Sequence, residues 1–97
     1  MLRRLELHLP GRTTLDLNLT FPKGFRPDLD EIAAIAEARV YRVLRESVTI
    51  AFADNQPAWR IAAVSLKRSR AVSPALLAHE LSSFHGMAKF VITPVRN

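Results

Sequence analysis

The chain has 97 residues, enough for one hydrophobic core, and we expect residues 1–97 to form a single compact domain. Apolar residues make up 48% of it, which argues against intrinsic disorder. There is no cysteine, so disulfides, thiolate metal sites and a cysteine nucleophile are excluded and a cytoplasmic location is expected. No stretch approaches the roughly 20 apolar residues of a membrane span, so we expect no membrane partner.

The formal net charge is +5, and arginine supplies eleven of the fourteen basic residues. Arginine favours bidentate contacts to phosphate and carboxylate groups, so this composition raises the expectation of a polyanionic partner. A genome rich in GC would enrich arginine without any ligand. Both explanations of the charge stay open at this point.

Two runs near the N-terminus alternate between apolar and polar residues. Residues 2–9 place Leu5, Leu7 and Leu9 on one side, and residues 13–21 repeat the pattern after a break at Pro10 and Gly11. A period of two is typical of a strand with one buried face. The short connection predicts that the two runs pair as an antiparallel hairpin.

A loop over residues 21–27 and a helix are predicted next. Two prolines and a glycine mark the loop, and Asp28 followed by Glu31 resembles a capping box. Apolar residues then recur at helical spacing, which predicts a helix to about Glu46. Its buried stripe comprises Leu29, Ile32, Ala33, Ala36, Val40, Val43 and Leu44, and its solvent side Asp30, Glu37, Tyr41, Arg42 and Arg45.

The second half predicts two strands, a helix and a last strand. Residues 48–52 alternate, residues 54–57 supply turn chemistry, and residues 58–67 are apolar on both sides. A strand of that last kind lies in the middle of a sheet or meets a partner on its second face. Ser73 and Pro74 are typical of a helix start, Gly86 of a helix end, and residues 87–95 form the last strand. The stripe of this helix comprises Leu77, Leu81 and Phe84.

The expected order is β-β-α-β-β-α-β, an α+β two-layer sandwich with a mainly antiparallel sheet and two helices on one face. From residue 13 onward it is the order of a ferredoxin-like split unit. In that fold the first strand is flanked on both sides, which leaves no place for a hairpin partner at residues 2–9. Either the hairpin displaces another strand or the sheet has a different order.

We expect no catalytic residue, no metal and no cofactor. His79 and His85 are six residues apart, whereas two metal-binding histidines on one helix face need a spacing of four. Ser82 and Ser83 lack a converging base, and the chain's three glycines form no phosphate loop. Helix capping accounts for the carboxylates near Asp28. We therefore expect a protein that is not an enzyme.

The sharpest candidate site comprises Lys67, Arg68, Ser69 and Arg70. These side chains directly precede a predicted helix start, where free backbone N–H groups and the helix dipole favour an anion. A phosphate or a partner carboxylate would suit this position. The alternative is a solvated charged loop.

Two weaker candidates lie elsewhere. Lys23 and Arg26 are interleaved with Phe21 and Phe25, a pattern that can hold single-stranded nucleic acid; the alternative is that Phe21 belongs to the core and Phe25 packs on the first helix. Arg42 follows Arg39 and precedes Arg45 at helical spacing, and this patch suits nucleic acid, an acidic partner or solvent.

Two functional hypotheses follow. The first is a small, basic, non-catalytic module that contacts nucleic acid or a nucleoprotein through phosphate interactions. The second is a protein-interaction module, such as a subunit, adaptor or inhibitor from a mobile element or accessory operon, that binds an acidic protein surface. An exposed sheet edge would also allow homodimerisation by strand addition.

The candidate segment at residues 67–70 gives a direct test. Replacing Arg68 and Arg70 by Ala should weaken binding to a labelled oligonucleotide, because two phosphate contacts are lost. The free energy of unfolding should change by less than about 0.5 kcal/mol, as is usual for exposed loops. A variant that fails to fold would contradict the premise that this loop is exposed.

Overall fold

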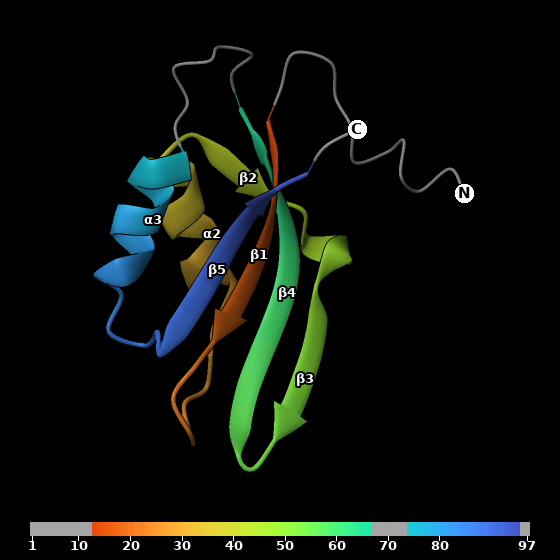
Figure 1. Ribbon diagram of the computed structural model, residues 1–97, viewed down its shortest axis with the longest axis vertical. Helices are drawn as coiled ribbons and strands as arrows, with labels where there is room; N and C mark the ends of the chain where they lie inside the picture. Colours follow the sequence, from red (N-terminus) through yellow and green to blue (C-terminus); the bar gives the residue numbers. More distant parts are fainter. Residues whose placement is uncertain (1–12, 67–73, 96–97) are drawn as a thin grey trace.

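The computed structural model describes residues 13–66 and 74–95. Figure 1 shows the described elements as one sheet with two helices beside it. In chain order they are β1 (Thr14–Thr20), α2 (Leu29–Ala38), β2 (Tyr41–Val43), the 3-10 turn η1 (Arg45–Ser47), β3 (Thr49–Ala53), β4 (Gln56–Ser65), α3 (Pro74–Ser82) and β5 (Lys89–Pro94).

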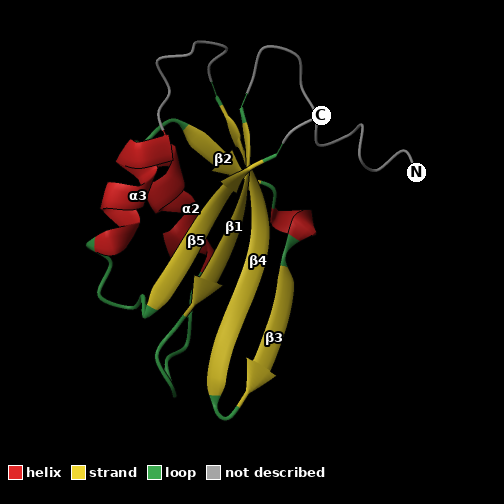
Figure 2. Ribbon diagram, viewed as in Figure 1, coloured by secondary structure: helices red, strands yellow, loops and turns green. Residues whose placement is uncertain are grey.

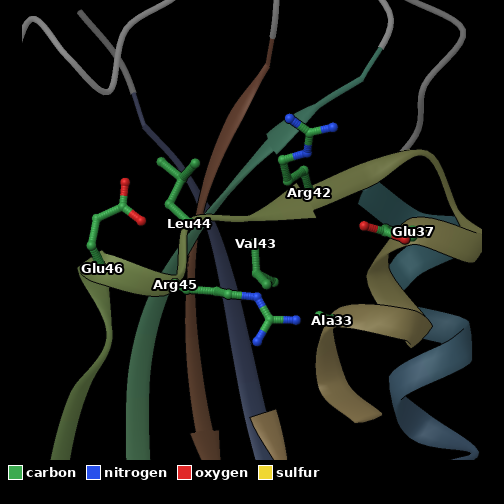
Figure 3. A pocket seen from close by; sticks show the side chains of 7 residues that line it. All are labelled: Ala33, Glu37, Arg42, Val43, Leu44, Arg45 and Glu46. Atoms are coloured by element: carbon green, nitrogen blue, oxygen red, sulfur yellow. The ribbon is translucent and has the colours of Figure 1, made fainter. Parts of the chain in front are cut away.

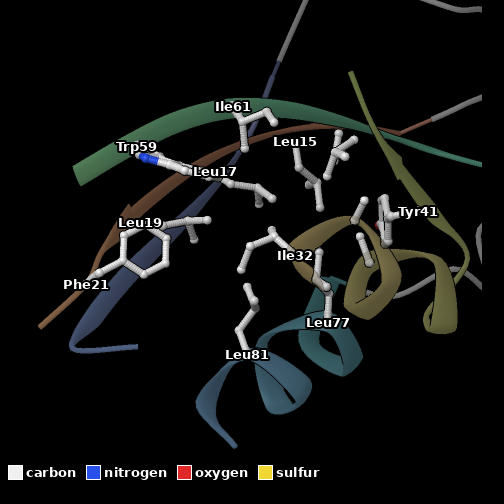
Figure 4. Close-up of a cluster of buried hydrophobic side chains, with 14 residues drawn as sticks. Leu15, Leu17, Leu19, Phe21, Ile32, Tyr41, Trp59, Ile61, Leu77 and Leu81 are labelled. Atoms are coloured by element: carbon white, nitrogen blue, oxygen red, sulfur yellow. The ribbon is translucent and has the colours of Figure 1, made fainter. Parts of the chain in front are cut away.

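The sheet is antiparallel throughout, with the order β2-β4-β1-β5, and β3 pairs with the same edge of β4 as β2 does. Both helices cover one face of this sheet, as the close-up of the core shows (Figure 4). The predicted two-layer α+β sandwich is thereby confirmed. With β2 and β3 counted as one interrupted strand, the order is that of the ferredoxin-like split β-α-β unit.

Both edges of β1 are occupied. Leu17 lies opposite Ile61 of β4 on one side and opposite Ile92 of β5 on the other. A hairpin between residues 2–9 and β1 therefore has no edge of β1 to occupy along the paired length of the strand. Residues 2–9 themselves lie outside the described residues.

The core lies between the sheet and the helices (Figure 4). The alternating residues of β1 predicted to face inward are at most 1% exposed, and Phe21 continues their row. Burying such side chains supplies the main driving force for folding, roughly 1.5–3 kcal/mol for each large one. The buried hydrophobic residues are Leu15, Leu17, Leu19, Phe21, Ile32, Ala33, Ala36, Tyr41, Val43, Trp59, Ile61, Ala63, Leu77 and Leu81.

The strand β4 is buried on both faces in its second half. Ala63 faces the helices, and its neighbours Ala62 and Val64 on the opposite face are only 8% and 5% exposed. This confirms the prediction of a central strand, although β4 begins at Gln56, inside the segment expected to be a turn. The turn itself comprises Asp54 and Asn55, both with positive φ, as a tight two-residue hairpin requires.

The first helix begins as predicted but ends eight residues early. Asp28 caps it by accepting a hydrogen bond from the backbone N–H of Asp30 (3.0 Å). The helix stops at Ala38 because Val40 adopts a left-handed φ of 67° and the chain turns into β2, which pairs with β4. The prediction of a helix to Glu46 was therefore wrong, and Tyr41, expected on its solvent side, is fully buried.

A short break separates β2 from β3. The hydroxyl of Ser47 accepts a hydrogen bond from the backbone N–H of Ala62 (2.9 Å) and donates one to the carbonyl of Leu44 (2.6 Å). Ser47 thus replaces a missing contact of the β ladder, which allows both strands to stay on the same edge of β4.

The second helix starts at the predicted residue but ends at Ser82, so Phe84, predicted in its buried stripe, lies beyond it and is half-buried, while the last strand forms within the predicted range. The helix α3 begins at Pro74 with Leu77 and Leu81 buried, while Ser73, its expected cap, lies outside the described residues. Gly86, expected to end the helix, lies beyond it, and a side chain there would clash with the ring of Phe25.

The buried hydroxyl of Tyr41 gives a test of this core. Among the described residues, Tyr41 Oη is the buried side-chain polar atom without a hydrogen-bond partner, and burial raises the pKa of this phenol above its usual 10. Tyr41→Phe should raise the free energy of unfolding by about 1 kcal/mol, because it removes an unsatisfied polar group. Chemical denaturation measures this, and a loss of more than about 1 kcal/mol would show that the hydroxyl has a partner.

Candidate functional site

The predicted site residues do not form one surface. Lys23 and Arg26 are exposed in the loop after β1, which is tied to the β3–β4 turn by a hydrogen bond from Gly24 N–H to the carbonyl of Asn55 (2.8 Å). Arg42 is exposed on β2, opposite Val64, at the other end of β1. The length of β1 separates the two positions by roughly 20 Å. Lys67, Arg68, Ser69 and Arg70 lie outside the described residues.

The aromatic side chains of the loop after β1 belong to the core. Phe21 is fully buried, and its ring meets Trp59 edge to face with centroids 5.4 Å apart. The ring of Phe25 stacks on Phe21 at 5.9 Å and meets Phe84 and His85 beyond the end of α3. These rings are not presented to a nucleic-acid base, and the structural interpretation of this loop is confirmed for Phe21. Phe25 makes its ring contacts with residues outside the first helix.

A pocket of about 360 Å³ lies beside Arg42 (Figure 3). Its lining mixes two arginines with two glutamates, and Arg45 donates a hydrogen bond to Asp30 (2.7 Å). This mixture of charges does not form a pocket for one class of anion. The lining residues are Ala33, Glu37, Arg42, Val43, Leu44, Arg45 and Glu46.

Three of the described basic side chains are neutralised by ion pairs. Arg39 on α2 pairs with Glu80 on α3, Arg45 pairs with Asp30, and Arg60 pairs with Asp16 across the uncovered face of the sheet (Nη2 to Oδ2, 3.0 Å). The Asp16 carboxylate raises the pKa of Arg60 further above its usual value, through a hydrogen bond and charge attraction. The exposed guanidinium of Arg42 has no ion pair with any other described residue.

Positive charge is distributed unevenly along the chain. The described residues carry seven Lys or Arg against eight Asp or Glu, whereas the whole chain carries 14 against nine. The positive excess therefore belongs to sequence outside the described ranges. Four described residues adjoin it. Thr13, Leu66 and Val95 lie at the same end of the sheet as Arg42, since Ser65 N–H bonds to the carbonyl of Thr13 (2.8 Å) and Val95 N–H to that of Thr14 (2.9 Å), and the fourth, Pro74, begins α3.

The residues considered for catalysis have structural contacts. Glu80 pairs with Arg39, and the hydroxyls of Ser82 and Ser83 donate hydrogen bonds to the carbonyl of His79 (2.7 and 3.3 Å). Within residues 13–66 and 74–95, no three His, Asp or Glu side chains are placed to hold a metal ion. No helix in the same ranges is both long enough and apolar enough to cross a bilayer.

A second feature, at the edge of the sheet, was not located from the sequence. All five residues of β3 are exposed, and Ile50 and Phe52 keep 61% and 65% of their surface accessible. Neither helix lies against this strand, as Figure 2 shows. The residues predicted to be apolar on both sides are buried in the second half of β4, whereas the exposed apolar side chains lie on its neighbour β3. The available signal was the absence of any charge from Thr49 to Ala53.

Comparison with models of protein families, with curated proteins and with solved structures finds no match.

Proposed function

We propose that this chain is a small non-catalytic binding domain that contacts nucleic acid or a nucleoprotein through arginine and lysine contacts to phosphate. The observation that carries the proposal is the position of Thr13, Leu66 and Val95 at one end of the sheet, next to Arg42, which forms no ion pair with another described residue. The stretches of sequence that adjoin these three residues hold the positive excess of the chain.

This arrangement suits a polyanion better than a small ligand. Each basic side chain that contacts a phosphate releases condensed counterions, so several such contacts from separate segments give affinity without a preformed pocket. The mixed charges beside Arg42 and the absence of an aromatic platform in the loop at Phe25 favour contacts to the backbone over contacts to bases. The expected binding is therefore weakly dependent on sequence and strongly dependent on salt.

Arg42 and Arg26 provide a matched pair of variants for this proposal. Both are exposed arginines, and they lie at opposite ends of β1. Arg42→Ala should weaken binding to a labelled single-stranded oligonucleotide several-fold and should reduce the slope of log K against log salt by about 1, because one phosphate contact is lost. Arg26→Ala should leave affinity and slope unchanged.

Fluorescence anisotropy between 50 and 300 mM salt measures both quantities. An equal loss in the two variants would show that net charge alone accounts for binding. No binding by the unaltered chain at low salt would contradict the proposal. Co-elution with nucleic acid that is lost at high salt, read from the 260/280 nm absorbance ratio on size exclusion, provides an independent check.

A second candidate is a protein-interaction module, and the exposed strand β3 favours it. Uncharged, unpaired strand edges with large apolar side chains are sites where another chain adds a strand. The two candidates use different parts of the molecule, because β3 reaches away from Arg42 toward the turn at Asp54 and Asn55 (Figure 1).

A further inference from the structure

The backbone geometry of β3 leaves two residues whose N–H and C=O groups pair with no strand among the described residues. The carbonyl of Pro57 accepts a hydrogen bond from Phe21 N–H (3.0 Å), so the backbone groups of Pro57 point toward β1 and away from β3. Phe52, which lies opposite Pro57, therefore belongs to a pair without hydrogen bonds. Pairs with and without hydrogen bonds alternate along an antiparallel ladder, so the pair of Ile50 with Trp59 also has no hydrogen bonds. Both residues direct their N–H and C=O groups to the free edge.

The side chains of these two residues also lie on one face. Ile50 is opposite Trp59 and Phe52 is opposite Pro57, so both point to the side of the sheet that carries the helices. They remain 61% and 65% exposed because neither helix extends beneath them. A strand that paired with β3 would satisfy two N–H and two C=O groups and would cover two large apolar side chains.

Charge and proline content distinguish the edge at β3 from the opposite edge of the sheet, at β5. The free edge strand β5 begins at Lys89 and ends at Pro94, and both residue types discourage a further strand. The strand β3 contains neither a charge nor a proline. The nearby Arg45 is held by Asp30 at 2.7 Å, so this guanidinium is neutralised beside the uncharged strand.

We propose that the partner at this edge is a second copy of the same chain, paired antiparallel to β3 about a two-fold axis at Ala51. In that register Ile50 of each copy lies opposite Phe52 of the other, and both of these pairs are hydrogen-bonded. Pairing of a β-branched with an aromatic side chain is favourable across strands. The edge is thus complementary to itself in backbone and in side chains, as an isologous interface requires.

The proposal rests on the protein-interaction candidate and is independent of nucleic-acid binding. Light scattering coupled to size exclusion at high salt should give twice the chain mass of 10.9 kDa. Phe52→Lys should give a monomer, because it places two charges in the interface. Val91→Lys, at an exposed valine of β5, should leave the dimer intact.

The absence of native cysteine allows the register to be tested directly. Ala51→Cys should form an intermolecular disulfide under mild oxidation, because residue 51 faces its own copy in a pair without hydrogen bonds, with Cα atoms about 4.5 Å apart. Ala53→Cys, on the same face of the same strand, should not, because the two sulfurs would be roughly 13 Å apart along the strands.

Three outcomes would overturn the proposal. Equal cross-linking at positions 51 and 53 would contradict the register, and a dimer that persists in Phe52→Lys would place the contact elsewhere. A monomer at all concentrations would exclude a second copy. A monomeric chain would still agree with the protein-interaction candidate if the amides of Ile50 and Phe52 became protected on adding a partner protein. Nucleic-acid binding is measured in a separate experiment.

Discussion

The structure depends on the two hydrogen-bonded edges of β4. One edge holds β1 over seven consecutive residue pairs, and the other holds β2 and β3 in succession. A strand used in this way has both hydrogen-bonding edges occupied, and the second half of β4 is in addition buried on both faces. Every other strand takes its position from β4 directly, except β5, which pairs with β1.

This arrangement separates two kinds of surface. At one end of the sheet β1 begins and β4 and β5 end, next to the exposed Arg42. Toward the other end β3 extends beyond the helices with Ile50 and Phe52 uncovered. The proposed phosphate contacts and the proposed strand pairing therefore use different places on the molecule.

Local signals in the sequence were sufficient where a single element determined the outcome. The alternation of leucines fixed the inward face of β1, and Asp28 marked the start of α2. The end of α2 was not predictable in this way, because Val40, Val43 and Leu44 continue a helical spacing. Pairing of residues 41–43 with residues 63–65 overrides that spacing, and it is a contact between segments far apart in the chain. A three-residue strand is too short to display a period of its own.

The candidate sites were less predictable for the same reason. The strand order places Lys23 and Arg26 at one end of β1 and Arg42 at the other. It also determines that β3 is exposed. The absence of charge in Thr49–Ala53 is visible in the sequence, but a central strand can show the same pattern. Only the strand order of the sheet distinguishes an uncharged edge strand from an uncharged central strand.

The most direct test is residue-resolved amide hydrogen exchange along β3 at two protein concentrations. We expect the amides of Thr49, Ala51 and Ala53, which face β4, to exchange slowly at both concentrations. Those of Ile50 and Phe52 should exchange quickly in dilute protein and slowly in concentrated protein, as a second copy covers the edge. Equal protection of all five amides at every dilution, or fast exchange of Ile50 and Phe52 at every concentration, would contradict this expectation.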